Sequence, residues 1–264
     1  MTSTVDRTCL ENAADPADIN SVLGKVRLIL DSFGAESDEL SLTELVQRSG
    51  VAKATVHRLA NELMIWGLLE RSGTRYRLGL RLFELGQSVP RQRILRQAAL
   101  PYMEDLLIGT GETIHFAIHD GLDVLYVEKI IGHRGLDKES RVAGRLPLYS
   151  TATGKAILAF SPDTLFAEVV AVGLRPVTRH TTVSAAVLRK QIERIRREHI
   201  AIEHEETRLG YSSMAVPVFG SSALLAGALS VTSPTVRMNV GRLSVALRAA
   251  GQGISRTLQA MTNV

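Results

Sequence analysis

The chain has little of what marks secreted, membrane-embedded or strongly basic proteins. It holds a single cysteine, Cys9, so no disulfide can form within the chain. No apolar run approaches the roughly 18 to 20 residues of a membrane-spanning helix, and no basic-then-apolar leader opens the sequence. The net charge of +4 is too small to indicate nucleic-acid binding by itself. We therefore expect a soluble cytoplasmic protein without a membrane partner.

What the chain does have is apolar residues for cores and enough length for two modest domains. Apolar residues make up 45% of the 264 residues, which is ample for folded cores. Residues 1–20 are polar without a sustained period, and we expect them to form a disordered tail. Helical spacing then predicts a first helix over 21–33.

Residues 41–79 carry the clearest pattern. Two apolar stripes at helical spacing predict two short helices. Ser49-Gly50 should end the first helix, because glycine tolerates the left-handed conformation of a helix end. After Trp66-Gly67 the period changes to two, which predicts a β-hairpin with its turn at Ser72-Gly73-Thr74. Two helices joined by a tight turn and followed by a hairpin indicate a winged helix-turn-helix over residues 21–79.

The same stretch is locally basic, with seven Lys and Arg against two Glu between residues 46 and 81. We expect the second helix to enter a DNA major groove and the hairpin to contact the flanking backbone, since phosphate contacts need cations. Arg58 and Lys53 should contact base edges or phosphate, whereas Thr55 and His57 are nearer to base reading. The alternative is a small helical domain with a solvated charged face. The candidate DNA-contacting residues are Thr43, Lys53, Ala54, Thr55, His57, Arg58, Arg71, Arg75 and Arg77.

Beyond the hairpin, residues 80–97 should form a helical linker interrupted at Pro90. The next helix should run to about Leu107, with Pro101 kinking it or marking a fresh helix start. Alternation from Glu112 predicts two strands joined at Asp120-Gly121. Residues 141–160 read as an irregular segment entering a helix. A loop over 175–184, a helix after Thr182 or Ser184, three strand-like segments between 200 and 234 and a final helix over 240–261 complete an α+β domain over 98–264.

Seven stretches stand out in this order along the chain: VAKATVHRL, YRLG, ETIHFAI with HDG and VLYVEKI, LPLYSTATGKAILA, QIERIRREHIAIEHEE, LGYSSMAVPVFG and ALSVTSP. Together they give the chain a resemblance to the IclR family of bacterial transcriptional regulators. The resemblance implies an N-terminal winged helix-turn-helix domain, a linker helix and a C-terminal GAF-like mixed α/β domain that senses a small organic acid. It also implies a homodimer or a dimer of dimers that reads an inverted-repeat operator on double-stranded DNA and controls a catabolic operon.

The TATGK motif, Thr151 to Lys155, is the first candidate for the sensing site. Small residues ahead of a helix starting near Gly154 could expose backbone N–H groups to a ligand anion. A nucleotide-binding P-loop does not fit, because Tyr149 stands where that motif needs glycine and Ala156 where it needs serine or threonine. The alternative is that the motif is an ordinary helix cap.

Further effector residues follow from the resemblance. Ser213 stands where many relatives have Cys, and Glu203 where some have Asp, so the effector could differ. Ser230 and Thr232 alternate on one strand face and could instead be satisfied within the sheet. The resemblance assigns the pocket to Ala152, Thr153, Glu203, Ser213, Ser230 and Thr232, and the TATGK motif adds Thr151 and Gly154.

Metal binding and catalysis are the remaining alternatives. His115 and His119 fall on one expected strand, where residues four apart lie over about 13 Å from each other and cannot share an ion. We therefore expect no metal and no cofactor. An enzyme acting on a small acid with an appended DNA-binding domain is the alternative function. However, no base is positioned for Ser212, Ser213 or Ser230, and no G-x-S-x-G elbow occurs. A non-specific DNA-binder would leave the second domain without a purpose.

Overall fold

The computed structural model describes residues 20–34, 37–132 and 142–262, and it divides into two compact units between Pro90 and Arg91. The expected tail over residues 1–20 lies outside the described ranges except for Asn20. Within the described ranges no helix combines the length and apolar character needed to cross a bilayer.

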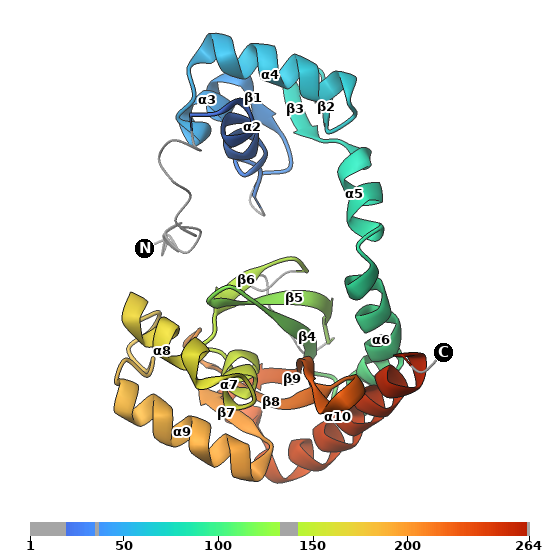
Figure 1. The fold of residues 1–264 in the computed structure, drawn as a ribbon, viewed down its shortest axis with the longest axis vertical. Helices are drawn as coiled ribbons and strands as arrows, with labels where there is room; N and C mark the ends of the chain where they lie inside the picture. Colours follow the sequence, from blue (N-terminus) through green and yellow to red (C-terminus); the bar gives the residue numbers. More distant parts are fainter. Residues whose placement is uncertain (1–19, 35–36, 133–141, 263–264) are drawn as a thin grey trace. The chain divides into compact units, whose positions relative to one another are not determined.

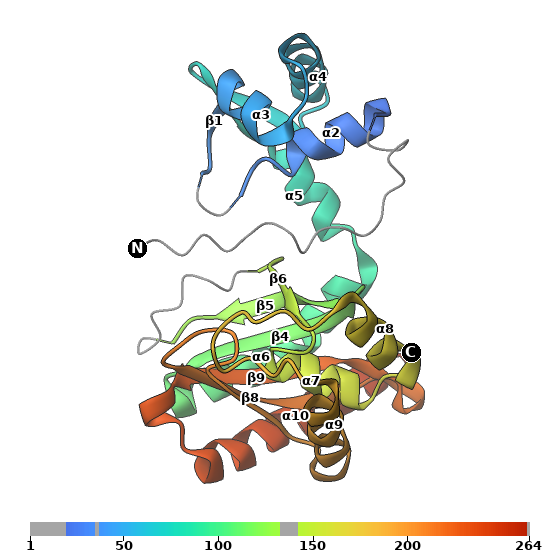
Figure 2. The ribbon, with the colours of Figure 1, turned by 90° about the vertical axis from the view of Figure 1, so that its left-hand side faces the viewer.

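The first unit contains the expected helix-turn-helix, with α2 (Val22–Leu30), α3 (Leu42–Ser49) and α4 (Lys53–Ile65). A capping box begins α3: the Ser41 hydroxyl accepts from the Glu44 N–H, and the Glu44 carboxylate accepts from the Ser41 N–H. Gly50 ends the helix at φ 68°, in the left-handed conformation that glycine adopts without strain. Figure 2 shows these three helices from a second direction.

The wing is a three-stranded sheet rather than a plain hairpin. Strands β2 (Leu69–Ser72) and β3 (Arg75–Leu78) form the expected hairpin, and β1 (Leu40–Ser41) pairs with the other edge of β3. Leu40 of β1 is fully buried in the core of the unit. A short helix, α5 (Leu80–Gln87), follows.

The second unit is built on one antiparallel sheet in the order β6-β5-β4-β9-β8-β7. Helix α6 (Pro90–Thr110) precedes it and begins at a proline, which lacks an N–H that the first helical turn does not use. The helix continues through Pro101, so no fresh helix starts there. The strands are β4 (Thr113–Asp120), β5 (Asp123–Ile130), β6 (Arg145–Pro147), β7 (Ala201–His204), β8 (Tyr211–Phe219) and β9 (Leu225–Pro234).

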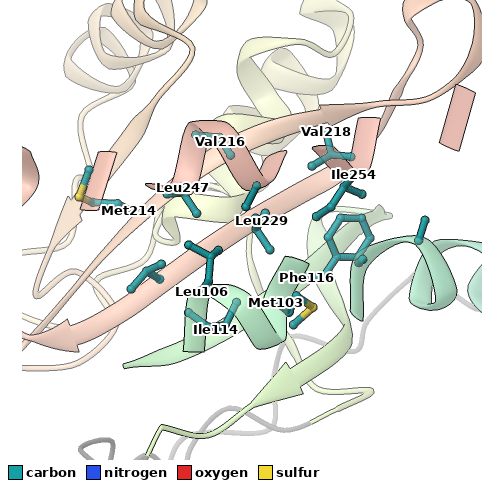
Figure 3. Packing of buried hydrophobic residues seen from close by; sticks show 14 of the residues in the cluster. Met103, Leu106, Ile114, Phe116, Met214, Val216, Val218, Leu229, Leu247 and Ile254 are labelled. Atoms are coloured by element: carbon teal, nitrogen blue, oxygen red, sulfur yellow. The ribbon is translucent and has the colours of Figure 1, made fainter. Parts of the chain in front are cut away.

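Helices cover both faces of this sheet. Helices α6 and α10 (Val240–Thr262) enclose one core, with Met103 and Leu247 packed against Phe116 and Leu229 (Figure 3). The opposite face carries α7 (Ala152–Ala159), α8 (Asp163–Val172) and α9 (Ala185–Glu198) over a second core. In Figure 1, α6 and α10 lie on the right side of this unit and the other three helices on its left side.

Strand alternation decides which residues face α7. Met214 and Leu229 contribute to the α10 side, whereas their neighbours Ala215 and Ala228 contribute to the α7 side.

Two helices of this unit differ from the sequence-based prediction. Helix α7 begins at Ala152 instead of Gly154, and helix α8 was not foreseen.

Candidate functional site

Helix α4 presents its candidate DNA-contacting residues away from the core. Val56 and Leu59 are buried in the core of the first unit, and Lys53, Ala54, His57 and Arg58 are exposed, while Thr55 is half-buried. Thr43 is exposed on α3. The amphipathic spacing of α4 thus produces a continuous polar face of the kind that a major groove can accept.

Few of these side chains are held by other protein groups. Arg58 forms an i,i+4 ion pair with Glu62 at 2.6 Å, and both side chains are about half exposed. Within the described ranges no hydrogen-bond or ion-pair partner is present for Lys53 or His57. An exposed helical pair contributes roughly 0.3–0.5 kcal/mol, so a phosphate can replace Glu62 at little cost.

The wing arginines are held to different degrees. Arg71 lies at the hairpin turn, donates to the Gly73 carbonyl at 3.1 Å and stacks over Tyr76. Arg77 pairs with Glu70 at 2.8 Å. The Leu80 N–H and then Arg77 lower the pKa of Glu70.

Arg75 reinforces the start of α3. It donates to the Glu39 carbonyl and to the Glu44 carboxylate of the capping box, at 3.0 and 2.8 Å. Hydrogen bonds from Ser41, then Arg75, lower the pKa of Glu44 to about 2. Arg75 therefore also stabilises the fold of the unit, whereas Arg71 and Arg77 are exposed at the wing.

The second unit contains a pocket on the α7 side of the sheet. Its volume is about 70 Å³, which is room for several waters or for one compact ligand. All of the expected effector residues except Gly154 line it. The lining residues are His115, Tyr126, Leu146, Thr151, Ala152, Thr153, Glu203, Thr207, Arg208, Tyr211, Ser213, Ser230 and Thr232.

Strand register brings the polar wall of this pocket together. Glu203 on β7 pairs with Ser213 on β8, and Ser213 pairs with Thr232 on β9. One step along, Ser230 on β9 pairs with His115 on β4. Since these positions alternate with residues of the α6–α10 core, all of them face α7. The Ser213 and Thr232 hydroxyls lie 3.0 Å apart and hydrogen-bond each other.

The N-terminus of α7 forms the opposite wall. Thr151 caps the helix, and its hydroxyl accepts from the Gly154 N–H at 2.9 Å. The first N–H groups of a helix have no acceptor within it, and here they belong to Ala152 and Thr153. The Thr153 hydroxyl is buried and has no hydrogen-bond partner among the described residues. A polar ligand group in the pocket would satisfy it.

Gly154 has a packing role. A Cβ on this residue would lie 2.2 Å from the Leu148 carbonyl oxygen, so only glycine allows α7 to approach that segment. Its N–H is already used by the Thr151 cap. Gly154 therefore has no N–H left to offer a ligand, and the N–H groups of Ala152 and Thr153 take that place.

Glu203 is the buried acid of the pocket. Its side chain accepts from the Glu206 N–H at 2.8 Å, and the residue is 1% exposed. Burial raises the pKa of Glu203 to about 7, and hydrogen bonds from the Glu206 N–H and the Ser213 hydroxyl oppose that rise only in part. The carboxyl can thus change its protonation near neutral pH.

Lys155 lies behind the pocket, fully buried in an ion pair with Glu206. Burial lowers the pKa of Lys155. Glu206 also accepts from the Thr182 N–H at 2.9 Å, and its carbonyl accepts from the Thr181 hydroxyl at 2.7 Å. The lysine of TATGK therefore fixes the segment after β7 and the loop before α9, and it is not among the lining residues.

Several lining residues were missed by the sequence analysis. His115 packs on Tyr126 with ring centroids 5.0 Å apart, and Arg208 lies 4.4 Å over the Tyr211 ring. Tyr211 precedes Ser213 by two, so strand alternation could have indicated it. Arg208 lies in a short turn without periodicity and had no such signal. Leu146 and Thr207 complete the set.

His115 and His119, the two histidines considered as metal ligands, lie in different surroundings. His115 is buried, whereas His119 is exposed and contacts the Gly121 carbonyl at 2.6 Å. Within the part of the chain that the structure describes, no group of three His, Cys, Asp or Glu residues is arranged to hold a metal ion.

A helix-turn-helix unit joined to a unit with a ligand pocket defines a DNA-binding transcriptional regulator with a sensing domain. Family models agree with both halves. The IclR helix-turn-helix domain matches residues 22–73, and the bacterial transcriptional regulator IclR C-terminal domain matches residues 87–256. The chain belongs to the IclR family of bacterial transcriptional regulators.

Individual relatives extend over most of the chain. It is 32% identical over 236 residues to the transcriptional regulator XynR of Escherichia coli, covering 87% of this chain and 94% of that one. It is 34% identical over 231 residues to KdgR of the same organism, covering 86% and 87%. An IclR homologue from Microbacterium hydrocarbonoxydans, solved in complex with 4-hydroxybenzoate, matches with TM-score 0.85 and 28% identity over 91% of this chain and all of that one.

Proposed function

We propose that two copies of this regulator read an inverted-repeat operator, each placing α4 in a major groove. The observation that carries this proposal is the row of Lys53, Ala54, Thr55, His57 and Arg58, which is exposed except for the half-buried Thr55. Arg58 and Lys53 would contact base edges or phosphate, and Thr55 and His57 would read bases. Thr43, Arg71, Arg75 and Arg77 would position the unit on the backbone.

The second copy is proposed from apolar surface in the first unit. Leu80 and Phe83 lie three residues apart on one face of α5, with 64% and 61% of their surface exposed. Such a face is typical of a helix that is covered by another chain. A homodimer, or a dimer of dimers, would cover it and also match the two half-sites of an inverted repeat.

For the second unit we propose a small organic acid as effector and a catabolic operon as target. The first N–H groups of α7 and the Arg208 side chain favour an anion, and the hydroxyls of Thr153 and Ser230 suit a second polar group. The neighbour solved with 4-hydroxybenzoate supports this ligand class. Binding would favour one dimer arrangement and so change operator affinity. As a reader of bacterial DNA, the protein would act in the cytoplasm.

A matched pair of arginine variants tests the DNA-reading surface. Arg58→Ala removes an α4 cation paired i,i+4 with Glu62, and Arg194→Ala removes an α9 cation paired i,i+4 with Glu198. The operator is first selected from genomic fragments, and affinity is then measured by fluorescence anisotropy. Arg58→Ala should weaken binding by about 1–3 kcal/mol, and Arg194→Ala should leave it unchanged. Equal affinities for both variants would contradict the proposed surface.

A further inference from the structure

Three buried charged side chains meet beside the pocket, and they do not balance. Lys155 and Glu206 form an ion pair with each other. Glu203 is the third, 1% exposed, and its carboxyl lines the pocket. Its backbone donor, the Glu206 N–H, and its neighbour Ser213 supply hydrogen bonds but no positive charge. When ionised, Glu203 leaves these three side chains with one net negative charge.

The groups around Glu203 offer limited compensation. From α7, Lys155 attracts it, but that ammonium is already bound to Glu206. The turn after β7 contributes Glu206, which repels it, and Arg208, whose guanidinium lies over Tyr211. From the sheet, His115, Tyr126 and Tyr211 face the same pocket. Among the described lining residues, Arg208 is the one permanently charged cation.

An acidic effector would bring a further negative charge into this small space. Two carboxylates that share a small buried site disfavour each other's charged form, so keeping both ionised is costly. Arg208 can neutralise one of them. We propose, building on the acidic effector proposed above, that the pocket binds the effector anion together with one proton, which resides on Glu203.

Binding of the effector takes up one proton. The effector enters as the carboxylate, the proton comes from solvent, and no covalent bond forms or breaks. Protonated Glu203 then gains an O–H that donates to the effector carboxylate, while the other carboxyl oxygen keeps the Glu206 N–H. Glu203 thereby selects for anions: a cationic effector would instead bind the ionised carboxylate and exclude the proton.

Calorimetry on the full chain tests this, with 4-hydroxybenzoate, benzoate and pyruvate as probes in phosphate and Tris buffers from pH 6 to 9. The two buffers release different heats on deprotonation, so their difference counts the protons taken up. With the pKa of Glu203 at about 7, uptake at pH 8 should be about 0.9 proton per anion, and affinity should be about fiftyfold lower at pH 9 than at pH 7.

Two variants assign the proton. Glu203→Gln keeps the size and removes the charge, so uptake should vanish and affinity should no longer depend on pH. His115→Gln removes the imidazole that also lines the pocket, and uptake should persist whatever its affinity. The buffer comparison on the unmodified chain stands even where a variant folds poorly.

The outcomes separate the two proposals. A probe that binds without proton uptake, or uptake that persists in Glu203→Gln, overturns the role of Glu203 and leaves the acidic effector intact. If none of the three acids binds at pH 6, where Glu203 is mostly protonated, the acidic effector fails and the proton-coupled mode fails with it.

Discussion

Two ion pairs between a basic side chain and a glutamate, one in each unit, differ sharply in their exposure. Arg58 and Glu62 on α4 are 2.6 Å apart and about half exposed. Lys155 and Glu206 beside the pocket are fully and nearly fully buried. The exposed pair contributes little, because water and salt screen it. Breaking the buried pair would leave a charge without a partner in a dry interior.

The exposed and the buried ion pair differ in whether the cation has to exchange its carboxylate for another partner. A cation that contacts DNA has to leave its protein partner, so a weak exposed pair suits α4. A pocket that senses a ligand has to keep its walls, and Glu206 holds the segment after β7, α7 and the loop before α9 together through Lys155, Thr181 and Thr182. On the proposed function, charge therefore serves DNA reading in one unit, while in the other it fixes geometry.

The largest expected effect comes from breaking the buried pair. Lys155→Met leaves Glu206 without its cation and should lower the free energy of unfolding of the second unit by about 3–5 kcal/mol. Lys190→Met on the exposed face of α9 is the matched control and should change it by less than about 0.5 kcal/mol. Urea unfolding followed by circular dichroism measures both. Similar urea midpoints for the two variants would show that the buried ion pair stabilises the second unit no more than an exposed lysine does.

A second expected effect concerns the pH dependence of stability at Glu203. Burial raises the pKa of Glu203 from 4.5 to about 7 in the folded chain. The folded state therefore holds this proton more tightly than the unfolded state. The resulting contribution to the free energy of unfolding is fully present below pH 4.5 and is lost as pH rises through 7. Glu203→Gln should therefore match the unmodified chain at low pH and exceed its free energy of unfolding at pH 8 by up to about 3 kcal/mol. Urea unfolding at pH 5 and pH 8 measures the difference.

Glu205→Gln provides a control of opposite sign. The Gly210 N–H, then Thr235, lower the pKa of Glu205, so its contribution is present above the unfolded pKa and is lost as pH falls. This variant should be the less stable one at pH 8. If both variants shift in the same direction, burial does not govern the Glu203 carboxyl.

The smallest expected effect belongs to the exposed pair. Arg58→Ala should change the free energy of unfolding of the first unit by no more than about 0.5 kcal/mol, while its loss of operator affinity is larger. Urea unfolding of the same preparation used for DNA binding gives the comparison. A stability loss that equals the loss of binding energy would mean that Arg58 supports the fold of the unit.

Local sequence signals were sufficient for the first unit. Ser41, Gly50 and the apolar spacing of α4 act within a few residues, so the helices and hairpin could be predicted. Strand β1 could not, since Leu40 pairs with Tyr76 across 36 positions of sequence. Helix α8 could have been found, because Pro162 precedes it and Leu165, Phe166 and Val169 follow helical spacing.

The pocket was predictable only in part. The β7, β8 and β9 residues follow from alternation and resemblance, and the register of the sheet brings them together. Arg208 and the Lys155–Glu206 pair depend on contacts between distant segments, which no local pattern encodes. Gly154 shows the limit of a motif: its place in TATGK suggested ligand binding, and the structure gives it a packing role.

The most direct test of the division between a DNA-reading helix and a sensing pocket uses Thr153→Val. The Thr153 hydroxyl is buried without a hydrogen-bond partner among the described residues, so removing it should affect the ligand and not the fold. Operator affinity is measured by fluorescence anisotropy while the effector is titrated. We expect the operator affinity of Thr153→Val without effector to be unchanged and its half-maximal effector concentration to be raised about tenfold. An unchanged effector response, or loss of DNA binding without effector, would contradict it.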